Sequence, residues 1–128
     1  MLNTGIKYTK TETVNENNTA AKVGSGLLPV YATPAMIALL EGACAEAVAP
    51  ELDAGMTTVG TKLDVEHVAA TPIGMDVTCE CELVEVDRRR LVFKVEISDA
   101  AGLIGKGTHE RFIVDSEKFM AKTAAKNS

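Results

Sequence analysis

One long segment of small and apolar residues restricts the fold of this chain more than any other feature. Between Pro34 and about Ala49 the segment carries only two charges, Glu41 and Glu46. Thr33 and Pro34 favour a helix start, because a threonine hydroxyl can cap free amides and proline fits the first helical position. We therefore expect a helix at residues 34–49 that is buried on most sides. Its many alanines would allow the backbone of other elements to approach it closely.

The hydrophobic period changes from 3.6 to 2 after this helix, which predicts strands. The expected strands lie at residues 5–14, 57–68, 74–86, 91–98 and 103–114. Proline, aspartate and glycine mark the turns at 71–74, 87–90 and 99–102, and we interpret all three turns as antiparallel hairpins. Residues 15–26 are expected to form an irregular connection able to act as a lid, and residues 116–126 a short amphipathic helix.

One long helix on a single antiparallel sheet of five strands is a two-layer α+β arrangement. A sheet that wraps around one central helix is the hot-dog fold, and we predict it for a single domain at residues 1–128 with a short C-terminal helix. Such a small sheet gains by pairing its exposed edge with a second copy. We expect at least a homodimer, and the sequence leaves open whether a tetramer forms.

Charge and composition exclude several classes of partner. With 13 basic and 18 acidic residues the net charge is −5, and there are only two Tyr, three Phe and no Trp. The chain therefore lacks both a positive field and a stacking surface for nucleic acid. It has neither a signal-peptide pattern nor about 18 consecutive apolar residues, so we expect a cytoplasmic protein without a membrane partner.

The cysteines and histidines do not have the spacing of a metal site. The chain has two histidines, His67 and His109, and three cysteines, Cys44, Cys79 and Cys81. An odd number of cysteines does not suggest a disulfide framework, and free thiols usually pack in the core. We expect reduced, buried thiols and no bound metal.

Glu41 is the residue of the helix that packing explains least. Its helical neighbours at three and four positions cannot neutralise it. An inward-facing glutamate there suggests a general base or a carboxylate that orients one, and the simpler alternative is a glutamate at the helix rim. Thr33 has an ordinary role as the helix cap. It is eight residues from Glu41, roughly 12 Å along a helix, so either the substrate lies between them or a second subunit completes the site.

His67 lies at the end of its predicted strand. Alternation places it on the apolar face, which also carries Val59, Thr61, Leu63 and Val65. It is either a satisfied core histidine or a functional group presented beside a turn.

Several short segments together resemble a known family. They are VYATP at 30–34, LLE at 39–41, GT at 60–61, HVAATPIG at 67–74 and GKGTHER at 105–111. Over about residues 24–122 the chain resembles the fluoroacetyl-CoA-thioesterase-like branch of the hot-dog thioesterase superfamily. The resemblance implies a dimeric enzyme that hydrolyses a short acyl-CoA thioester, with Thr33, Glu41 and His67 matching the family's catalytic set. It implies no cofactor beyond the coenzyme A of the substrate, and the acyl group stays open.

In the preferred mechanism Glu41 is the base or nucleophile, His67 is its proton partner, and Thr33 positions the attacking oxygen or the thioester. Backbone amides at Gly60 and Thr61, or at the helix start, could bind the oxyanion. The further candidates for substrate binding are Leu27, Leu28, Arg88, Arg89, Arg90 and Arg111.

The basic candidates also have structural explanations. The arginine cluster at 88–90 could contact the phosphates of coenzyme A or form a solvated turn. Arg111 could bind substrate or pair with Glu110 or another carboxylate, and pairing is favoured.

Two other functions fit the same features. One is a binding module that holds an acyl-CoA or another small hydrophobic ligand without cleaving it. The other is a hot-dog enoyl-CoA hydratase, which would also use an inward-facing acid and a histidine. Free thiol release distinguishes the thioesterase from both.

Overall fold

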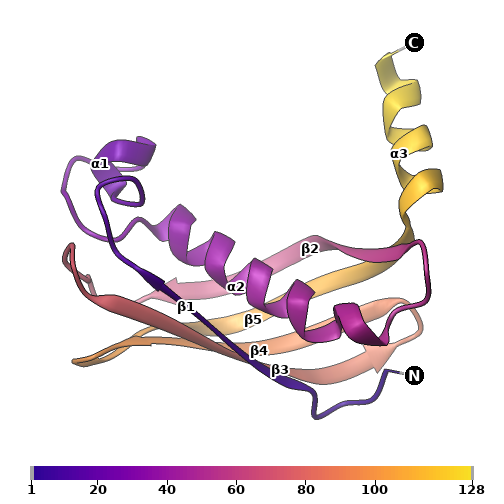
Figure 1. The fold of residues 1–128 in the computed structure, drawn as a ribbon, viewed down its shortest axis with the longest axis horizontal. Coiled ribbons are helices and arrows are strands. Elements are labelled where there is room, and N and C mark those ends of the chain that lie inside the picture. Colours follow the sequence, from indigo (N-terminus) through magenta and orange to yellow (C-terminus); the bar gives the residue numbers. More distant parts are fainter. Residues whose placement is uncertain (1, 128) are drawn as a thin grey trace.

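Five antiparallel strands form one sheet, and a single long helix lies across one face of it (Figure 1). The structure is a computed structural model that describes residues 2–127. In chain order its elements are β1 (Lys7–Thr13), α1 (Ala20–Val23), α2 (Thr33–Val48), η1 (Ala49–Glu51), β2 (Met56–His67), β3 (Asp76–Asp87), β4 (Arg90–Asp99), β5 (Gly102–Asp115), α3 (Ser116–Ala124) and η2 (Ala125–Asn127). The predicted helix, strands and C-terminal helix are confirmed.

The order of the strands corrects one predicted hairpin. The sheet runs β1-β3-β4-β5-β2, so β2 and β3 are not neighbours and the turn at 71–74 is part of a crossover. The hairpins β3–β4 and β4–β5 form as predicted. Because these three strands already pair in sequence, β1 and β2 add to the two outer edges of the group, β1 beside β3 and β2 beside β5.

Helix α2 buries a set of its side chains against the sheet. The set comprises Met36, Leu39, Leu40, Ala43, Cys44, Ala47 and Val48. It packs with inward-facing residues of β3, β4 and β5, and Cys44, Cys79 and Cys81 are free and buried in this core, as predicted. The cap prediction is wrong: Ala32 is the N-cap without a side-chain hydrogen bond, and Thr33 is already the first helical residue. The Thr33 hydroxyl is therefore available for another partner.

A β-bulge in β2 changes which residues face the helix. The register with β5 shifts between Gly60 and Lys62. Before the bulge, Thr58 and Gly60 face the α2 side, where they meet Arg111 and Glu41, and after it His67 does. One extra residue in a strand reverses the alternation beyond it. The predicted single face from Val59 to His67 is therefore wrong.

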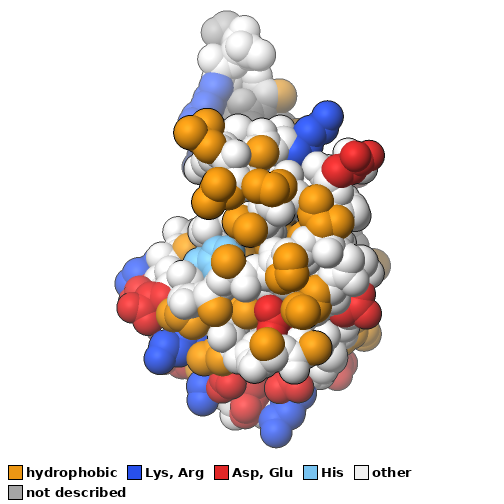
Figure 2. Space-filling model, turned by 90° about the vertical axis from the view of Figure 1, so that its left-hand side faces the viewer, with side chains coloured by type: hydrophobic (Ala, Val, Ile, Leu, Met, Phe, Trp, Pro, Cys, Tyr) orange, Lys and Arg blue, Asp and Glu red, His pale blue; other side chains and the backbone are white. Residues whose placement is uncertain are grey.

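The connection predicted to be irregular contains the short helix α1. Thr19 caps it by accepting a hydrogen bond from the Lys22 backbone amide, and Gly24 ends it with a φ of 81°. The chain that follows α1 joins the segment after β2, because the Tyr31 amide donates to the Thr71 carbonyl and Val30 forms an isolated bridge with Pro72. Figure 2 views the α1 end and shows hydrophobic side chains gathered there. The exposed large hydrophobic residues of α1, of the chain just after it and of the segment after β2 are Val23, Leu27, Leu28, Val68 and Ile73. We call these five residues the α1-end patch.

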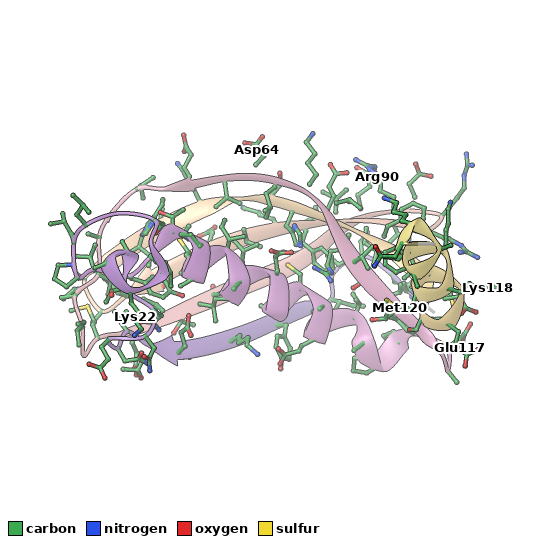
Figure 3. The ribbon with its side chains drawn as sticks, turned by 90° about the horizontal axis from the view of Figure 1, so that it is seen from above. Lys22, Asp64, Arg90, Glu117, Lys118 and Met120 are labelled. Carbon is green, nitrogen blue, oxygen red and sulfur yellow. The ribbon has the colours of Figure 1, made fainter. Side chains whose placement is uncertain are left out.

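Helix α3 projects from the end of β5, away from the sheet (Figure 1). Asp115 caps it by accepting a hydrogen bond from the Lys118 backbone amide. Glu117, Lys118 and Met120 all lie on this projecting helix, as seen from above in Figure 3, and α3 has no buried residue. None of the helices within residues 2–127 combines the length and the apolar character needed to cross a membrane.

Gly107 is a position where the sheet has no room for a side chain. A Cβ built there would meet the backbone of β2, with the Cα of Val65 at 2.7 Å. Because backbone cannot move aside cheaply, we expect Gly107→Ala to lower the free energy of unfolding by about 2 kcal/mol, which corresponds to a fall of roughly 10 °C in Tm. Thermal and urea unfolding measure both quantities.

The matched control is Gly42→Ala in the middle of α2. There the nearest atoms lie at 3.6 Å, an ordinary contact. Alanine favours a helix over glycine by about 1 kcal/mol, so this variant should be at least as stable as the wild type. Equal stability of the two variants would contradict the close β2–β5 packing.

Candidate active site

The start of α2 and the end of β2 meet through one hydrogen bond. Thr33 Oγ1 lies 2.7 Å from His67 Nδ1. His67 is the last residue of β2 and pairs with Gly105 of β5. A Cβ at position 105 would lie 2.6 Å from the Met36 sulfur, so the glycine allows α2 to approach the strands here. This contact brings together two of the three predicted catalytic residues.

The imidazole of His67 is held on one side and unsatisfied on the other. The ring of Tyr31 packs edge-on against it, with ring centroids 6.5 Å apart and planes at 82°. Tyr31 is itself fixed, because its hydroxyl donates a hydrogen bond to the Glu12 carboxylate. His67 Nε2 is buried and has no hydrogen-bond partner within residues 2–127. Burial lowers the pKa of His67 from 6.5, which favours the neutral imidazole.

A shallow pocket of about 350 Å³ opens over this pair. Its lining includes Tyr31, Thr33, His67 and Val68. Leu27 and Leu28, which were predicted to bind substrate, do not line it and are strongly exposed, Leu27 at 94%. They belong to the α1-end patch, so their contact with an acyl group stays a prediction.

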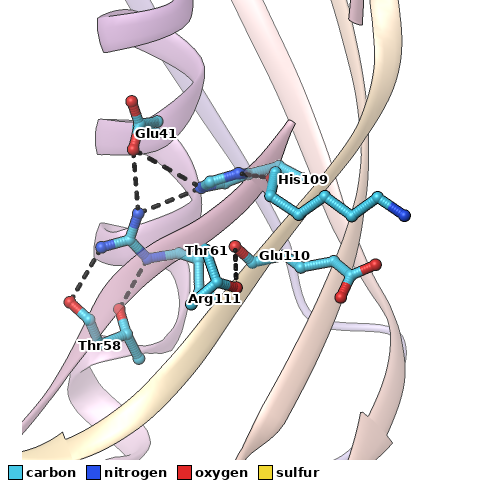
Figure 4. Close-up of polar contacts among 7 residues, drawn as sticks. Glu41, Thr58, Thr61, His109, Glu110 and Arg111 are labelled. Atoms are coloured by element: carbon cyan, nitrogen blue, oxygen red, sulfur yellow. Dashed lines mark hydrogen bonds and ion pairs between the residues drawn. The ribbon is translucent and has the colours of Figure 1, made fainter. Parts of the chain in front are cut away.

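Glu41 takes part in a second cluster, formed with β2 and β5 (Figure 4). Its Oε2 lies 3.7 Å from Arg111 Nη1 and 4.0 Å from His109 Nε2. Arg111 Nε donates to Thr58 Oγ1 at 2.8 Å, and its Nη2 donates to the Thr58 carbonyl at 2.9 Å. The Glu41 side chain is 38% exposed, whereas that of Arg111 is only 9% exposed. Glu41 thus has a cationic partner, supplied by the sheet and not by its own helix.

The bulge in β2 gives Glu41 its place. A Cβ on Gly60 would lie 2.6 Å from Glu41 Oε2, so any side chain at position 60 would push the carboxylate from its present place. Thr61 stands in the bulge, and its hydroxyl donates to the Glu110 carbonyl at 3.2 Å. Gly60 therefore lies beside Glu41, with Thr61 next to it in the bulge, and an oxyanion site here stays a prediction.

Glu41 and His67 do not form a pair within one chain. Glu41 contacts Gly60, and His67 lies seven residues further along β2, at most roughly 23 Å at about 3.3 Å per residue. Along α2, Thr33 contacts His67 and stands eight residues, or roughly 12 Å, from Glu41. The predicted proton transfer between them has no direct path in a single chain. One copy of the chain thus holds two half-sites, which we call the Thr33–His67 half-site and the Glu41 half-site.

Comparison with known proteins identifies the family. Residues 14–117 match the family described as fluoroacetyl-CoA-specific thioesterase. A fluoroacetyl-CoA thioesterase from Streptantibioticus cattleyicolor is 46% identical over 97 residues, which cover 76% of this chain and 70% of that protein. The chain belongs to the fluoroacetyl-CoA-specific thioesterase family.

Solved structures of the fluoroacetyl-CoA thioesterase agree with this, with a TM-score of 0.94. One of them, a variant in complex with acetyl-CoA, is 36% identical, and the match covers 99% of this chain and 100% of that one. A hot-dog-like protein from Thermanaerovibrio acidaminovorans is 21% identical and superposes with a TM-score of 0.89 over 98% of this chain and 93% of that one. The hot-dog fold is confirmed.

Both half-sites lie within the region that matches the fluoroacetyl-CoA-specific thioesterase family. The cluster around Glu41 contains His109, which was not predicted as a site residue. The sequence did contain an indication of this role, since His109 and Arg111 are two residues apart and so lie on the same face of β5. What was missing was the register that sets this face against the bulge of β2.

The same alternation corrects the predicted roles of the arginines. Arg111 does not pair with Glu110, because neighbouring residues of a strand point to opposite faces. It pairs with another carboxylate, that of Glu41, so the favoured prediction of a carboxylate partner is confirmed. Glu110 accepts from Arg90 Nε at 2.8 Å on the outer face, and Arg90 Nη1 also donates to Glu85 at 2.7 Å. Arg90 is therefore engaged in structural pairing, while Arg88 is 93% exposed and only loosely paired, with its Nε 3.8 Å from Asp87 Oδ1, so its guanidinium remains accessible to a ligand. Arg111 is buried beneath Glu41 and does not reach the surface cluster.

Within the described part of the chain, no group of three or more histidine, cysteine, aspartate or glutamate side chains is arranged to hold a metal ion.

Both histidines of this family member should titrate below the ordinary value. Burial lowers the pKa of His67 and of His109 from 6.5, and Arg111 adds to the effect on His109. The unfolded chain therefore binds more protons than the folded chain below about pH 6.5. Stability should be constant well above this pH and fall as the pH drops from 6.5 through the two folded pKa values.

Histidine NMR titration measures the two pKa values, and thermal unfolding between pH 7.5 and 5.5 measures the stability. The control is the urea-unfolded chain, in which both histidines should return to about 6.5. Either histidine titrating above 6.5 in the folded protein, or a rise in Tm on acidification through this range, would contradict the burial described.

Proposed function

We propose that this protein hydrolyses a short-chain acyl-CoA thioester to the free acid and coenzyme A. The observation that carries the proposal is the Thr33–His67 hydrogen bond of 2.7 Å, with the other ring nitrogen of His67 buried and without a hydrogen-bond partner among the described residues. A neutral imidazole that accepts from Thr33 at Nδ1 holds its proton at Nε2, where a substrate oxygen or a carboxylate would complete it. The family match supports thioester hydrolysis as the reaction.

The reaction adds water across the C–S bond. Glu41 acts as the base that takes a proton from the attacking water, or as the nucleophile that attacks the thioester carbon directly and forms an anhydride, which water then hydrolyses to release the acid and free Glu41. Negative charge then grows on the carbonyl oxygen, and the amides at the Gly60–Thr61 bulge or at the start of α2 could stabilise it. The C–S bond breaks, and the thiolate of coenzyme A receives a proton through His67. Thr33 positions the thioester or the attacking oxygen.

A second copy of the chain would bring the two half-sites together. Strand β2 is an edge of the sheet, and residues 60–64 are exposed. If β2 pairs antiparallel with β2 of a second copy about its middle, the partner's His67 reaches the stretch of residues 56–60, beside Glu41. The pairing would also cover an open sheet edge. We therefore propose a homodimer with two composite sites, and the possible tetramer stays a prediction.

Exposed side chains are the candidates for further contacts to the substrate. Leu27 and Leu28 of the α1-end patch are free to cover the acyl group, and the connection that holds them would serve as the lid. Arg88 and Arg89 remain the candidates for the phosphates of coenzyme A, because Arg90 is paired with Glu85 and Glu110. We propose a cytoplasmic location, which suits free cysteines and acyl-CoA substrates.

Glu41→Ala should lower turnover by about 10²–10⁴-fold, because the general base or nucleophile is lost. The measurement is thiol release from a series of acyl-CoA esters of increasing chain length. The matched control is Glu46→Gln, which changes the other acid of α2, bonded to Lys10 and Tyr8 outside the site.

An unchanged rate for Glu41→Ala would remove Glu41 from the mechanism. Tight binding of acyl-CoA without thiol release by the wild type would favour the binding module, and addition of water to an enoyl-CoA would favour the hydratase.

Mixing two inactive variants tests the composite site. In Glu41→Ala and His67→Ala homodimers, each composite site lacks one residue. Random exchange of subunits makes half of the dimers mixed, and each mixed dimer has one intact site, so activity should return to about a quarter of the wild-type value. The proposal would be contradicted if the mixture neither exchanged subunits nor recovered activity and sedimentation showed that the protein is a monomer. Mixed dimers without recovered activity would place both residues in one subunit's site.

A further inference from the structure

Two hydrogen bonds fix the imidazole of His109, a residue without a role in the mechanism above. Its side chain is fully buried. Nδ1 lies 2.8 Å from the Lys62 carbonyl oxygen, and Nε2 lies 3.1 Å from Arg111 Nη1. The same Nε2 is 4.0 Å from Glu41 Oε2. Because both ring nitrogens of this buried histidine have a hydrogen-bond partner, His109 belongs to a hydrogen-bonded network.

These partners determine the protonation state of the ring. A carbonyl oxygen can only accept, so Nδ1 of His109 carries a proton and donates to Lys62. A guanidinium has only donors, so Nε2 has no proton and accepts from Arg111. His109 is therefore a neutral imidazole with its proton on Nδ1. A proton on both nitrogens would set an N–H group against the guanidinium of Arg111.

The acceptor on His109 completes the fixation of Arg111. Two other hydrogen bonds tie Arg111 to Thr58, from Nε to the hydroxyl and from Nη2 to the carbonyl. Only the bond from Nη1 to His109 fixes the remaining side of the guanidinium, the side that lies 3.7 Å from Glu41 Oε2. Without this acceptor, Nη1 would lose its only hydrogen-bond partner among the described residues, and the guanidinium would be free to shift against Glu41 (Figure 4).

His109 also ties the bulge of β2 to this group. Lys62 is the residue at which pairing with β5 resumes after the bulge, and Gly60 is the last before it. Gly60 in turn borders the Glu41 carboxylate. One imidazole thus connects both surfaces that enclose Glu41, the guanidinium on β5 and the bulged backbone on β2.

We propose that His109 is a positioning residue for thioester cleavage: as a neutral imidazole it holds the Arg111 guanidinium and the Gly60–Lys62 bulge in the arrangement that orients the Glu41 carboxylate. The inference rests on the proposed function for its catalytic consequence. His109 does not contact the substrate and acts only through Arg111 and the bulge. Its position, and not a change in its charge, carries the effect.

Two conservative variants separate the two hydrogen bonds of His109. His109→Gln places an amide oxygen near the position of Nε2, so Arg111 keeps an acceptor. His109→Asn places an amide nitrogen near the position of Nδ1, so Lys62 keeps its donor and Arg111 loses its acceptor. We expect kcat of H109Q to stay within about 3-fold of the wild type, and kcat of H109N to fall about 10–100-fold with KM within about 3-fold, as for a carboxylate displaced by a fraction of an ångström.

Leu83→Val controls for general loosening of the core, because Leu83 is fully buried on β3, two strands away from His109 with Phe93 of β4 between them. Its kcat should stay within about 3-fold of the wild type even if its Tm falls as far as that of H109N. Equal kcat for H109Q, H109N and the wild type would overturn the proposal. So would equal losses in H109Q and H109N that Leu83→Val reproduces at a matched Tm.

An independent measurement separates this inference from the proposed function. The ¹⁵N shifts of the His109 ring in the wild type at pH 7 should be those of a neutral imidazole protonated at Nδ1. A proton on Nε2 would overturn the network whatever the activity. If the wild type released no thiol from any acyl-CoA while the Nδ1-protonated ring was observed, the proposed function would fail and the network would stand without its catalytic role.

Discussion

The close approach of α2 to the sheet is the constraint on which the rest of this molecule depends. It occurs at two glycines, Gly60 and Gly105, where an added Cβ would lie 2.6 Å from Glu41 Oε2 and from the Met36 sulfur. At both places a helix side chain lies directly on strand backbone, without the layer of side chains that normally separates helix and sheet. The Glu41 half-site stands at the first of these contacts, and the Thr33–His67 half-site beside the second.

Charge inside this apolar layer is tolerated because each group has a partner. Burial of Arg111 lowers its pKa, and Glu41 acts in the opposite direction, so the pair compensates part of the desolvation. Removing one member of a buried pair costs more than the pair contributes, because the other charge is left without compensation. The partial exposure of Glu41 reduces this penalty and keeps the carboxylate open to a ligand. The cluster therefore combines a fixed cation with an accessible anion.

Sequence patterns predicted the elements well and their mutual placement less well. The apolar segment and the alternating segments gave α2 and all five strands to within a few residues, because burial acts locally on each. The crossover after β2 and the β-bulge were wrong or missed, since each depends on strand pairing between distant residues. Pairing of Arg111 with a carboxylate was predicted, but only the strand register shows that this carboxylate is Glu41. Thr33 shows the same limit: as the first helical residue it leaves the cap to Ala32, and only the register of β2 with β5 places His67 beside its hydroxyl.

The strand order also separates the site residues into two groups, those on strands that pair with a sequence neighbour and those on segments that pair with distant parts of the chain. Strands β3, β4 and β5 form a continuous meander of short-range contacts, whereas β2 joins β5 only across the whole meander. Local contacts form faster than distant ones during folding, because they close shorter loops. His109 and Arg111 thus belong to the part of the chain able to assemble early, and Thr33, Glu41 and His67 come from segments that dock onto it afterwards. The nascent meander supplies a template that already carries the guanidinium when the carboxylate arrives.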